Sequence, residues 1–137
     1  SLEKLLTRSG IKIIKFYFSV SKEAQAARFQ ERRTNPLKQY KLSPIDQFSQ
    51  KLWDRYTLAE YLNFSQTHTE NAPWTIVRSD NKEQSRINAI KYLLSQFDYP
   101  DKIADKYLKI DEKIVFSGRE KARMLAKEID ESHSLFD

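Results

Sequence analysis

The apolar run from Ile11 to Phe18, IKIIKFYF, constrains the fold more than any other part of the sequence. Only two lysines and a tyrosine interrupt it, a composition typical of a strand that flanking helices bury on both faces. A second run, WTIVRS at 74–79, follows Pro73 and is rich in β-branched and aromatic residues, which favours another strand. Because helical patterns separate the two runs, the sequence predicts a parallel sheet in an α/β fold.

Two helices are expected before residue 36. The first ends near Arg8, where Gly10 can close it, so that the first strand follows a helix end. The second begins at Ser21, whose hydroxyl can cap it, and continues to about Arg33. Pro36 then disfavours any continuation of this helix.

A long helix over residues 44–64 is predicted after this break. Ser43 suits the N-cap, Pro44 the first helical position and Asp46 the third. Apolar residues at three- and four-residue intervals are expected to bury one face of this helix. They are Ile45, Phe48, Leu52, Tyr56, Ala59 and Leu62.

Two further helices are predicted in the rest of the chain. Asp80 is expected to cap the helix that follows the second strand, and Tyr99 and Pro100 end it. Its expected apolar face consists of Ile87, Ile90, Leu94 and Phe97. Ser117 and Glu120 match a capping box, which predicts a last helix that we expect to be peripheral.

Two strands are too few for a parallel sheet covered on both faces, since such sheets usually hold several strands. The missing strands can come from another chain. Alternatively, this sequence is the C-terminal portion of a longer polypeptide, or the missing strands belong to a segment that is absent from the sequence. We favour the second and third explanations.

Composition narrows the possible functions. The chain has 137 residues, a net charge of +5 at pH 7 and a sequence pI near 9.3, which favours a polyanionic partner. The absence of cysteine excludes disulfides, thiolate metal sites and cysteine nucleophiles, and a cytoplasmic setting is expected. Gly10 and Gly118, the two glycines, are too far apart for a glycine-rich phosphate-binding loop. No apolar run is long enough to span a bilayer, so a membrane is not an expected partner.

The positive charge is concentrated between residues 21 and 41, which hold six Lys or Arg against two Glu. Arg28 and Arg32 lie four positions apart and project from one helix face, with Arg33 beside them. Two lysines follow the break at Pro36. Guanidinium groups bind phosphate oxygens through paired hydrogen bonds, whereas lysine acts as a mobile point charge. We therefore interpret the segment as a phosphate-binding lid.

Lys38 and Lys41 lie in the turn, where mobile cations can stabilise a phosphoryl group during its transfer. Other interpretations stay open at this point. A basic helix face can simply maintain solubility. Tyr40 and Leu37 can also provide a stacking surface among the cations, as in a non-catalytic nucleic-acid-binding module. The predicted helix 44–64 can also pair with a second copy of itself.

The segment SVSKEAQAARFQERRTNPLKQYKLSPIDQFSQKLWDRYT resembles the lid region of family-2 polyphosphate kinases. In that family an R-F-x-x-R helix leads through a turn with proline and lysine to a helix bearing W-D-x-Y. The residues in register are Arg28, Phe29, Arg32, Pro36, Lys38, Lys41, Leu42, Ser43, Pro44, Asp46, Trp53, Asp54 and Tyr56. A second segment, THTENAPWTIVRSDNKEQSRINAIKYLL, resembles the family's next strand and helix. Its matching residues are Thr67, Thr69, Pro73, Trp74, Asp80, Lys82, Arg86 and Asn88.

The resemblance implies the C-terminal part of a three-layer α/β/α P-loop kinase fold with a parallel sheet and a helical lid. Residues 1–100 would form this part, with the lid at about 28–56. Residues 101–137, which resemble no segment of the family, would form a C-terminal extension with a terminal helix. The family's Walker A and Walker B segments lie upstream of the matching region.

The resemblance also implies a phosphotransferase that moves a phosphoryl group between inorganic polyphosphate and ADP or GDP, with ATP or GTP as the triphosphate. The catalytic residues would be Arg28, Arg32, Lys38 and Lys41. The residues that bind phosphate or nucleotide would be Arg33, Tyr40, Asp80, Lys82 and Arg86. No metal ligand is assigned, because Mg²⁺ would be bound mainly by residues and phosphates outside this segment.

The intact protein is expected to form a homo-oligomer, and this segment alone is expected to be inactive. Nucleic acid is not an expected partner of such a kinase. Tyr40 stands where the family usually has Trp, and His68 stands where it usually has an acidic residue. His68 and His133 are expected to be solvated side chains without a role, and Trp53 and Trp74 are expected to lie in the core.

Overall fold

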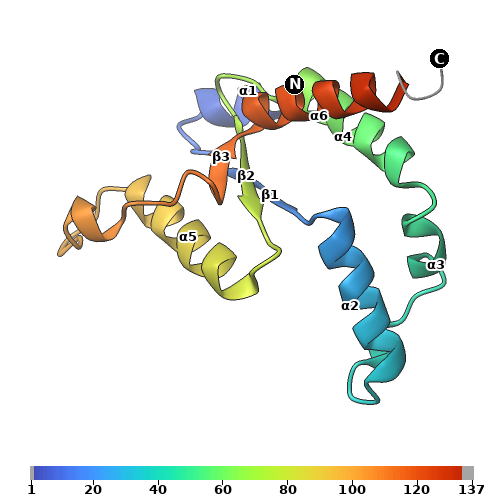
Figure 1. Cartoon of the computed structure of the whole chain (residues 1–137). Helices are drawn as coiled ribbons and strands as arrows, with labels where there is room; N and C mark the ends of the chain where they lie inside the picture. The colour runs from blue at the N-terminus through green and yellow to red at the C-terminus, as the bar shows by residue number, and fades with distance from the viewer. Residues whose placement is uncertain (1, 134–137) are drawn as a thin grey trace.

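The computed structural model describes residues 2–133, without the side chains of Gln47, Ser132 and His133 (Figure 1). The expectation for His133 therefore lies outside the described residues. In chain order the elements are α1 (Leu2–Arg8), β1 (Lys15–Ser19), α2 (Lys22–Thr34), η1 (Gln39–Lys41), α3 (Asp46–Ser49), α4 (Trp53–Thr67), β2 (Trp74–Arg78), α5 (Lys82–Ser95), η2 (Asp105–Tyr107), β3 (Val115–Ser117) and α6 (Gly118–His133). The fold belongs to the α/β class. No helix among the described residues is long and apolar enough to cross a membrane.

The described sheet has three strands in the order β1-β2-β3. β1 and β2 pair in parallel, with Tyr17 opposite Ile76, which confirms the predicted parallel pair. β3 pairs antiparallel to β2, with Phe116 also opposite Ile76, so the sheet is mixed. The sequence analysis did not predict β3, because its three residues are too few to show a strand pattern.

The first apolar run forms a shorter and more exposed strand than predicted. Residues 11–14 lie outside β1, and Phe18 within it is 53% exposed. Burial on both faces is therefore wrong for the described residues. β1 is an edge strand of the described sheet, so its outer edge and part of its surface have no covering element.

The predicted long helix is two helices, α3 and α4, separated by a turn at residues 50–52. The face predicted to be buried is largely exposed, since Ile45 is 64% and Phe48 55% exposed. α4 instead buries Thr57 and Phe64. The prediction selected the helix face with the larger apolar stripe. In the structure, α4 packs against its neighbours through a different face.

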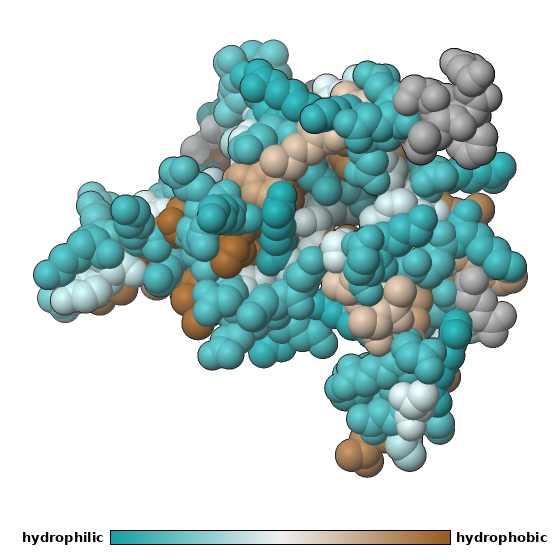
Figure 2. Space-filling model, in the orientation of Figure 1, coloured by the Kyte–Doolittle hydropathy of each residue, from teal (hydrophilic) through white to brown (hydrophobic). Residues whose placement is uncertain are grey.

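The buried face of α5 also differs from the predicted one. Ile87 and Ile90, predicted to be buried, are 41% and 56% exposed. The helix buries Ser85 and Asn88 instead. The Asn88 side chain accepts a hydrogen bond from the Asp111 backbone N–H at 2.8 Å, so α5 is joined to the segment before β3 through polar contacts. Figure 2 shows apolar surface among the hydrophilic side chains of this face of the molecule.

The core lies between the sheet and the pair formed by α4 and α6, while α5 covers the other face (Figure 1). Phe64, Ile76 and Leu125 form its buried centre. Tyr17 and Trp74 pack edge-on against Phe64, at ring-centroid distances of 5.0 and 5.9 Å. The core position of Trp74 is confirmed. The expectation that the last helix is peripheral is wrong, because α6 contributes Leu125 to this centre.

The predicted helix ends are confirmed in part. Ser21 caps α2 and Ser117 accepts a hydrogen bond from the first turn of α6. Gly10 has φ +82° after α1, as expected for a residue that closes a helix. Asp80 does not cap α5, since Asn81 accepts the capping hydrogen bond at 3.1 Å. The Asp80 carboxylate is instead engaged by the backbone N–H of Ser21.

His68 joins the start of β2 to the start of α6. Its Nδ1 accepts a hydrogen bond from the Trp74 backbone N–H at 3.2 Å, so the expectation of a solvated side chain is wrong. Burial, with the charges of Arg119 and Lys15, lowers the pKa of His68. A Cβ atom at Gly118 would lie 2.7 Å from the Trp74 Cβ and 2.8 Å from the His68 Nδ1. Glycine is therefore needed at Gly118 for this close approach.

We predict that Gly118→Ala lowers the free energy of unfolding by about 1–3 kcal/mol, because the added methyl group forces β2 and α6 apart. Urea unfolding followed by circular dichroism measures the loss. Gly10→Asn is the control, since Asn tolerates a positive φ and no atom lies within 4 Å of the new Cβ. An unchanged midpoint for Gly118→Ala would contradict the close approach.

We also predict that His68 makes the fold less stable in acid. Its lowered pKa means that the unfolded chain binds the proton more readily, so stability falls as pH drops below about 6.5, the ordinary histidine pKa. Protonation of Nδ1 would also remove the acceptor for Trp74. Other groups titrate in acid, so the measurement is the difference between wild type and His68→Asn across pH 5 to 8. Asn keeps an acceptor without titrating, and a constant difference would refute the role of His68.

Candidate phosphate-binding site

The carboxyl ends of β1 and β2 lie side by side because the two strands are parallel neighbours. The Ser79 backbone N–H donates to the Ser19 carbonyl oxygen at 2.8 Å, which holds the two following loops together. α2 begins after the first loop and α5 after the second (Figure 1). Ligands of open α/β sheets bind at this end of the strands.

Arg28 and Asp80, both predicted as site residues, fasten α2 to the loop after β2. The Asp80 Oδ1 atom accepts a hydrogen bond from the Ser21 backbone N–H at 2.8 Å. The Arg28 guanidinium donates to the Asp80 carbonyl oxygen at 3.0 Å and also to that of Ser79. These contacts place one strong cation at the base of α2, beside the strand ends.

We use the name lid for residues 28–56, as predicted. In the structure α2 extends away from the sheet, and α3 lies beside it before α4 returns to the core (Figure 1). Arg32 forms an ion pair with Asp46 at 2.9 Å, which joins α2 to α3. Gln50 donates a hydrogen bond to Gln25 at 2.8 Å, a second link between α2 and the end of α3. The lid is therefore held by polar contacts.

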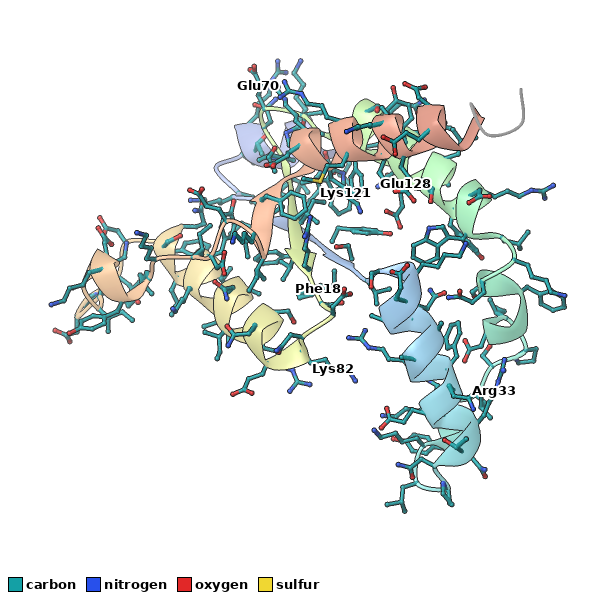
Figure 3. All side chains as sticks on the ribbon, viewed as in Figure 1. Phe18, Arg33, Glu70, Lys82, Lys121 and Glu128 are labelled. Carbon is teal, nitrogen blue, oxygen red and sulfur yellow. The ribbon has the colours of Figure 1, made fainter. Side chains whose placement is uncertain are left out.

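Lysines from the lid and from α5 converge around Glu31. Lys38 donates to the Glu31 carboxylate. This hydrogen bond and the charge of Lys38, with smaller contributions from Lys82 and Lys41, lower the pKa of Glu31. Lys82 lies at the start of α5 on the side that faces α2 (Figure 3). One predicted site lysine, Lys38, is therefore bound to Glu31, whereas Lys41 and Lys82 act on this carboxylate only through weaker charge effects.

The remaining predicted residues do not join this cluster. Arg33 lies on the α3 side of α2, away from Lys82 (Figure 3). Tyr40 is 78% exposed, and the Lys41 Nζ atom lies 5.3 Å from its ring centroid. Arg86 is exposed on α5, one turn after Lys82. The structure therefore gathers some of the predicted cations and leaves others on separate surfaces.

A cavity of about 470 Å³ lies behind the strand ends, between the starts of α2 and α4 and the inner side of α6. The cavity walls include Trp53, Asp54, Arg78, Lys121 and Glu128. The sequence analysis did not predict Lys121 and Glu128 because it treated α6 as peripheral. No local pattern marks them, since only the tertiary contact between α4 and α6 brings them to the strand ends.

Among the described residues, no group of three or more His, Cys, Asp or Glu side chains could hold a metal ion. The residues present do not form a magnesium site by themselves.

Residues 1–105 match polyphosphate kinase 2 (PPK2). The chain belongs to the polyphosphate kinase 2 family. The chain is 50% identical over 107 residues to the NDP-polyphosphate phosphotransferase 2 of Ruegeria pomeroyi. This match covers 78% of this chain and 30% of that protein. It is 52% identical over 101 residues to the GDP-polyphosphate phosphotransferase of Pseudomonas aeruginosa, covering 74% of this chain and 28% of that protein.

A third member of the polyphosphate kinase 2 family, the ADP-polyphosphate phosphotransferase 1 of Rhizobium meliloti, is 40% identical over 116 residues. That match covers 85% of this chain and 39% of the relative. The chain therefore corresponds to between 28% and 39% of the length of these three relatives.

We predict that Glu31→Gln tightens the binding of inorganic polyphosphate by a few fold at low salt. The substitution removes the anion that competes with phosphate for Lys38 and its neighbours. Fluorescence anisotropy with labelled polyphosphate measures the affinity.

Glu112→Gln is the control for this measurement, because it removes the same charge from the cavity wall beside His68 and Trp74, away from the lid. Equal affinities of the two variants would show that only net charge matters. Weaker binding by Glu31→Gln would contradict the competition.

Proposed function

We propose that this chain is part of a phosphotransferase that moves a phosphoryl group between inorganic polyphosphate and a nucleoside diphosphate such as ADP or GDP. The observation that carries the proposal is that Arg28 is fixed to the loop after β2 at the strand ends, while Arg32 and Lys38 lie in ion pairs along the lid. The names of the relatives, which specify polyphosphate with NDP, GDP or ADP, support it.

In the proposed reaction, polyphosphate replaces the protein carboxylates as the partner of the lid cations. An oxygen of the terminal phosphate of the nucleoside diphosphate forms a bond to the terminal phosphorus of the chain. The bridging P–O bond breaks, and the chain leaves one phosphate shorter with the electron pair on its new terminal oxygen. Cations that contact the transferring group stabilise the charge that spreads over its oxygens.

The residues have different proposed roles. Arg28 is fixed by the loop after β2 and supplies a stationary charge near the strand ends. Arg32, Lys38 and Lys41 lie on the lid and approach the transferring group with it. Lys82 and the Asp80 loop hold the nucleotide phosphates from the α5 side.

In this proposal, three of the predicted residues contact groups farther from the transferred phosphorus. They are Arg33, Tyr40 and Arg86. No step passes through a metal bound by this chain, because the donor set for one is lacking among the described residues. The three-layer P-loop arrangement, self-association and a cytoplasmic location remain predictions from the sequence. Non-catalytic nucleic-acid binding is not favoured, because the relatives are named for polyphosphate.

The test is a chimera in which this chain replaces the matching 101-residue segment of the Pseudomonas aeruginosa relative. We expect the chimera to make GTP from GDP and polyphosphate, and Lys41→Ala to lower its kcat by about 100-fold, because one transition-state cation is lost. Lys41 suits the test because its one described contact is the Tyr40 ring, so its removal spares the fold. Chromatography of the nucleotides measures the rate.

Lys51→Ala is the matched control, an exposed lysine in the turn between α3 and α4. A folded chimera that transfers no phosphoryl group would contradict the proposed function. Equal activity of the two lysine variants would leave the reaction in place and remove Lys41 from it.

A further inference from the structure

The cavity behind the strand ends has the size and position of a small-molecule site. Its volume of about 470 Å³ lies in the range of ligand pockets. Its walls come from the loop after β1, the starts of α2 and α4, the end of β2, and α6. α6 begins at Gly118, outside the residues 1–105 that match the family, so the match assigns no role to this wall.

Trp53 gives the cavity an aromatic wall. It was expected to lie in the core, but its side chain is only half-buried and it borders two adjoining cavities. Trp74, by contrast, packs against Tyr17 and Phe64 in the core. No aromatic ring among the described residues packs against Trp53, and its side chain contributes to the cavity wall.

Carboxylates without protein partners stand beside this indole. No described side chain forms a hydrogen bond or ion pair with Asp54 or Glu128, although both line the cavity. Lys121, the cation on the same side, lies 4.0 Å from the Glu60 carboxylate instead. Figure 3 shows Lys121 and Glu128 pointing from α6 toward the space that α4 borders. Both residues are exposed, so a ligand with hydrogen-bond donors would replace the water around the carboxylates of Asp54 and Glu128.

The cavity walls carry charges of both signs. Lys22 and Arg78 lie near the strand ends, beside the carboxylates of Glu23 and Asp80, while Lys121 accompanies Asp54 and Glu128 on the side of α4 and α6. Lys22 and Arg78 provide cations for a phosphate, and Asp54 and Glu128 provide acceptors for a neutral, donor-bearing group.

We propose that this cavity binds the nucleoside part of the nucleotide substrate. The base lies against Trp53, and Asp54 and Glu128 accept hydrogen bonds from its N–H groups or from the ribose hydroxyls. The phosphates extend toward the lid. This proposal rests on the proposed function and adds that α6 helps to select the nucleotide.

The experiment follows the indole N–H signal of Trp53 by NMR in the 137-residue chain, with the signal assigned by Trp53→Phe. ADP, GDP and pyrophosphate are titrated separately. We expect both nucleotides to shift the Trp53 signal while pyrophosphate leaves it in place. Glu128→Gln and Asp54→Asn should each weaken nucleotide binding by about tenfold, since each removes a charged acceptor.

Glu120→Gln is the matched control, because it makes the same change on α6 but faces the cavity beside His68 and Trp74. The proposal is overturned if pyrophosphate shifts Trp53 as much as the nucleotides do. It is also overturned if Glu128→Gln tightens binding, as removal of a merely repulsive charge would. Asp54→Asn carries the test if Glu128→Gln does not fold.

Polyphosphate binding by the same samples separates the two proposals. If polyphosphate binds and neither nucleotide shifts Trp53, the nucleoside cavity is wrong and the proposed function stands. If neither polyphosphate nor nucleotide binds, both proposals are overturned.

Discussion

The parallel pairing of β1 and β2 is the interaction on which the rest of the structure depends. It places the two carboxyl ends together, so that the Ser79 N–H reaches the Ser19 carbonyl oxygen. From there Asp80 can accept from Ser21, and Arg28 can donate to the loop that contains Asp80. The direction of α2, and with it the position of the lid, follows from these few contacts. A lid fixed at one end by short hydrogen bonds can deliver charge to a defined place.

Two cations of the lid are paired with its own carboxylates. Arg32 is paired with Asp46 and Lys38 with Glu31, so in the proposed function phosphate would displace these two carboxylates. The Lys38–Glu31 pair is exposed and is therefore worth little in water, whereas Arg32 and Asp46 are partly buried. A ligand with several closely spaced charges would replace both carboxylates at once, and in this way the proposed site would favour a polyphosphate chain over a single phosphate ion.

The sequence predicted the elements of the fold better than the faces they bury. The Ser21 cap and the close of α1 at Gly10 follow from local chemistry, which is visible in a sequence. The parallel pair follows from the helical patterns between the two strands. The predicted faces of α4 and α5 depend on neighbours. Ile45 and Ile87 are exposed, whereas α4 buries Thr57 and Phe64 and α5 buries Ser85 and Asn88. Among the candidate residues, Arg28 is predicted by its motif, whereas Glu128 has no motif and lines the cavity only through the packing of α6.

α6 connects the sheet, the returning helix of the lid and the cavity through one polar chain. The Tyr17 hydroxyl donates to Glu60 at 2.7 Å, and Lys121 lies 4.0 Å from the other carboxylate oxygen of Glu60. Burial and the Glu60 carboxylate raise the pKa of Tyr17, so its hydroxyl keeps its proton and remains a donor. β1, α4 and α6 are thereby held in one arrangement. Because α4 also carries Trp53 at its start, a shift of the lid through α4 would alter the cavity wall that Trp53 forms. In the two proposals, phosphate contacts at the lid and nucleoside contacts at α6 would therefore be linked mechanically through α4.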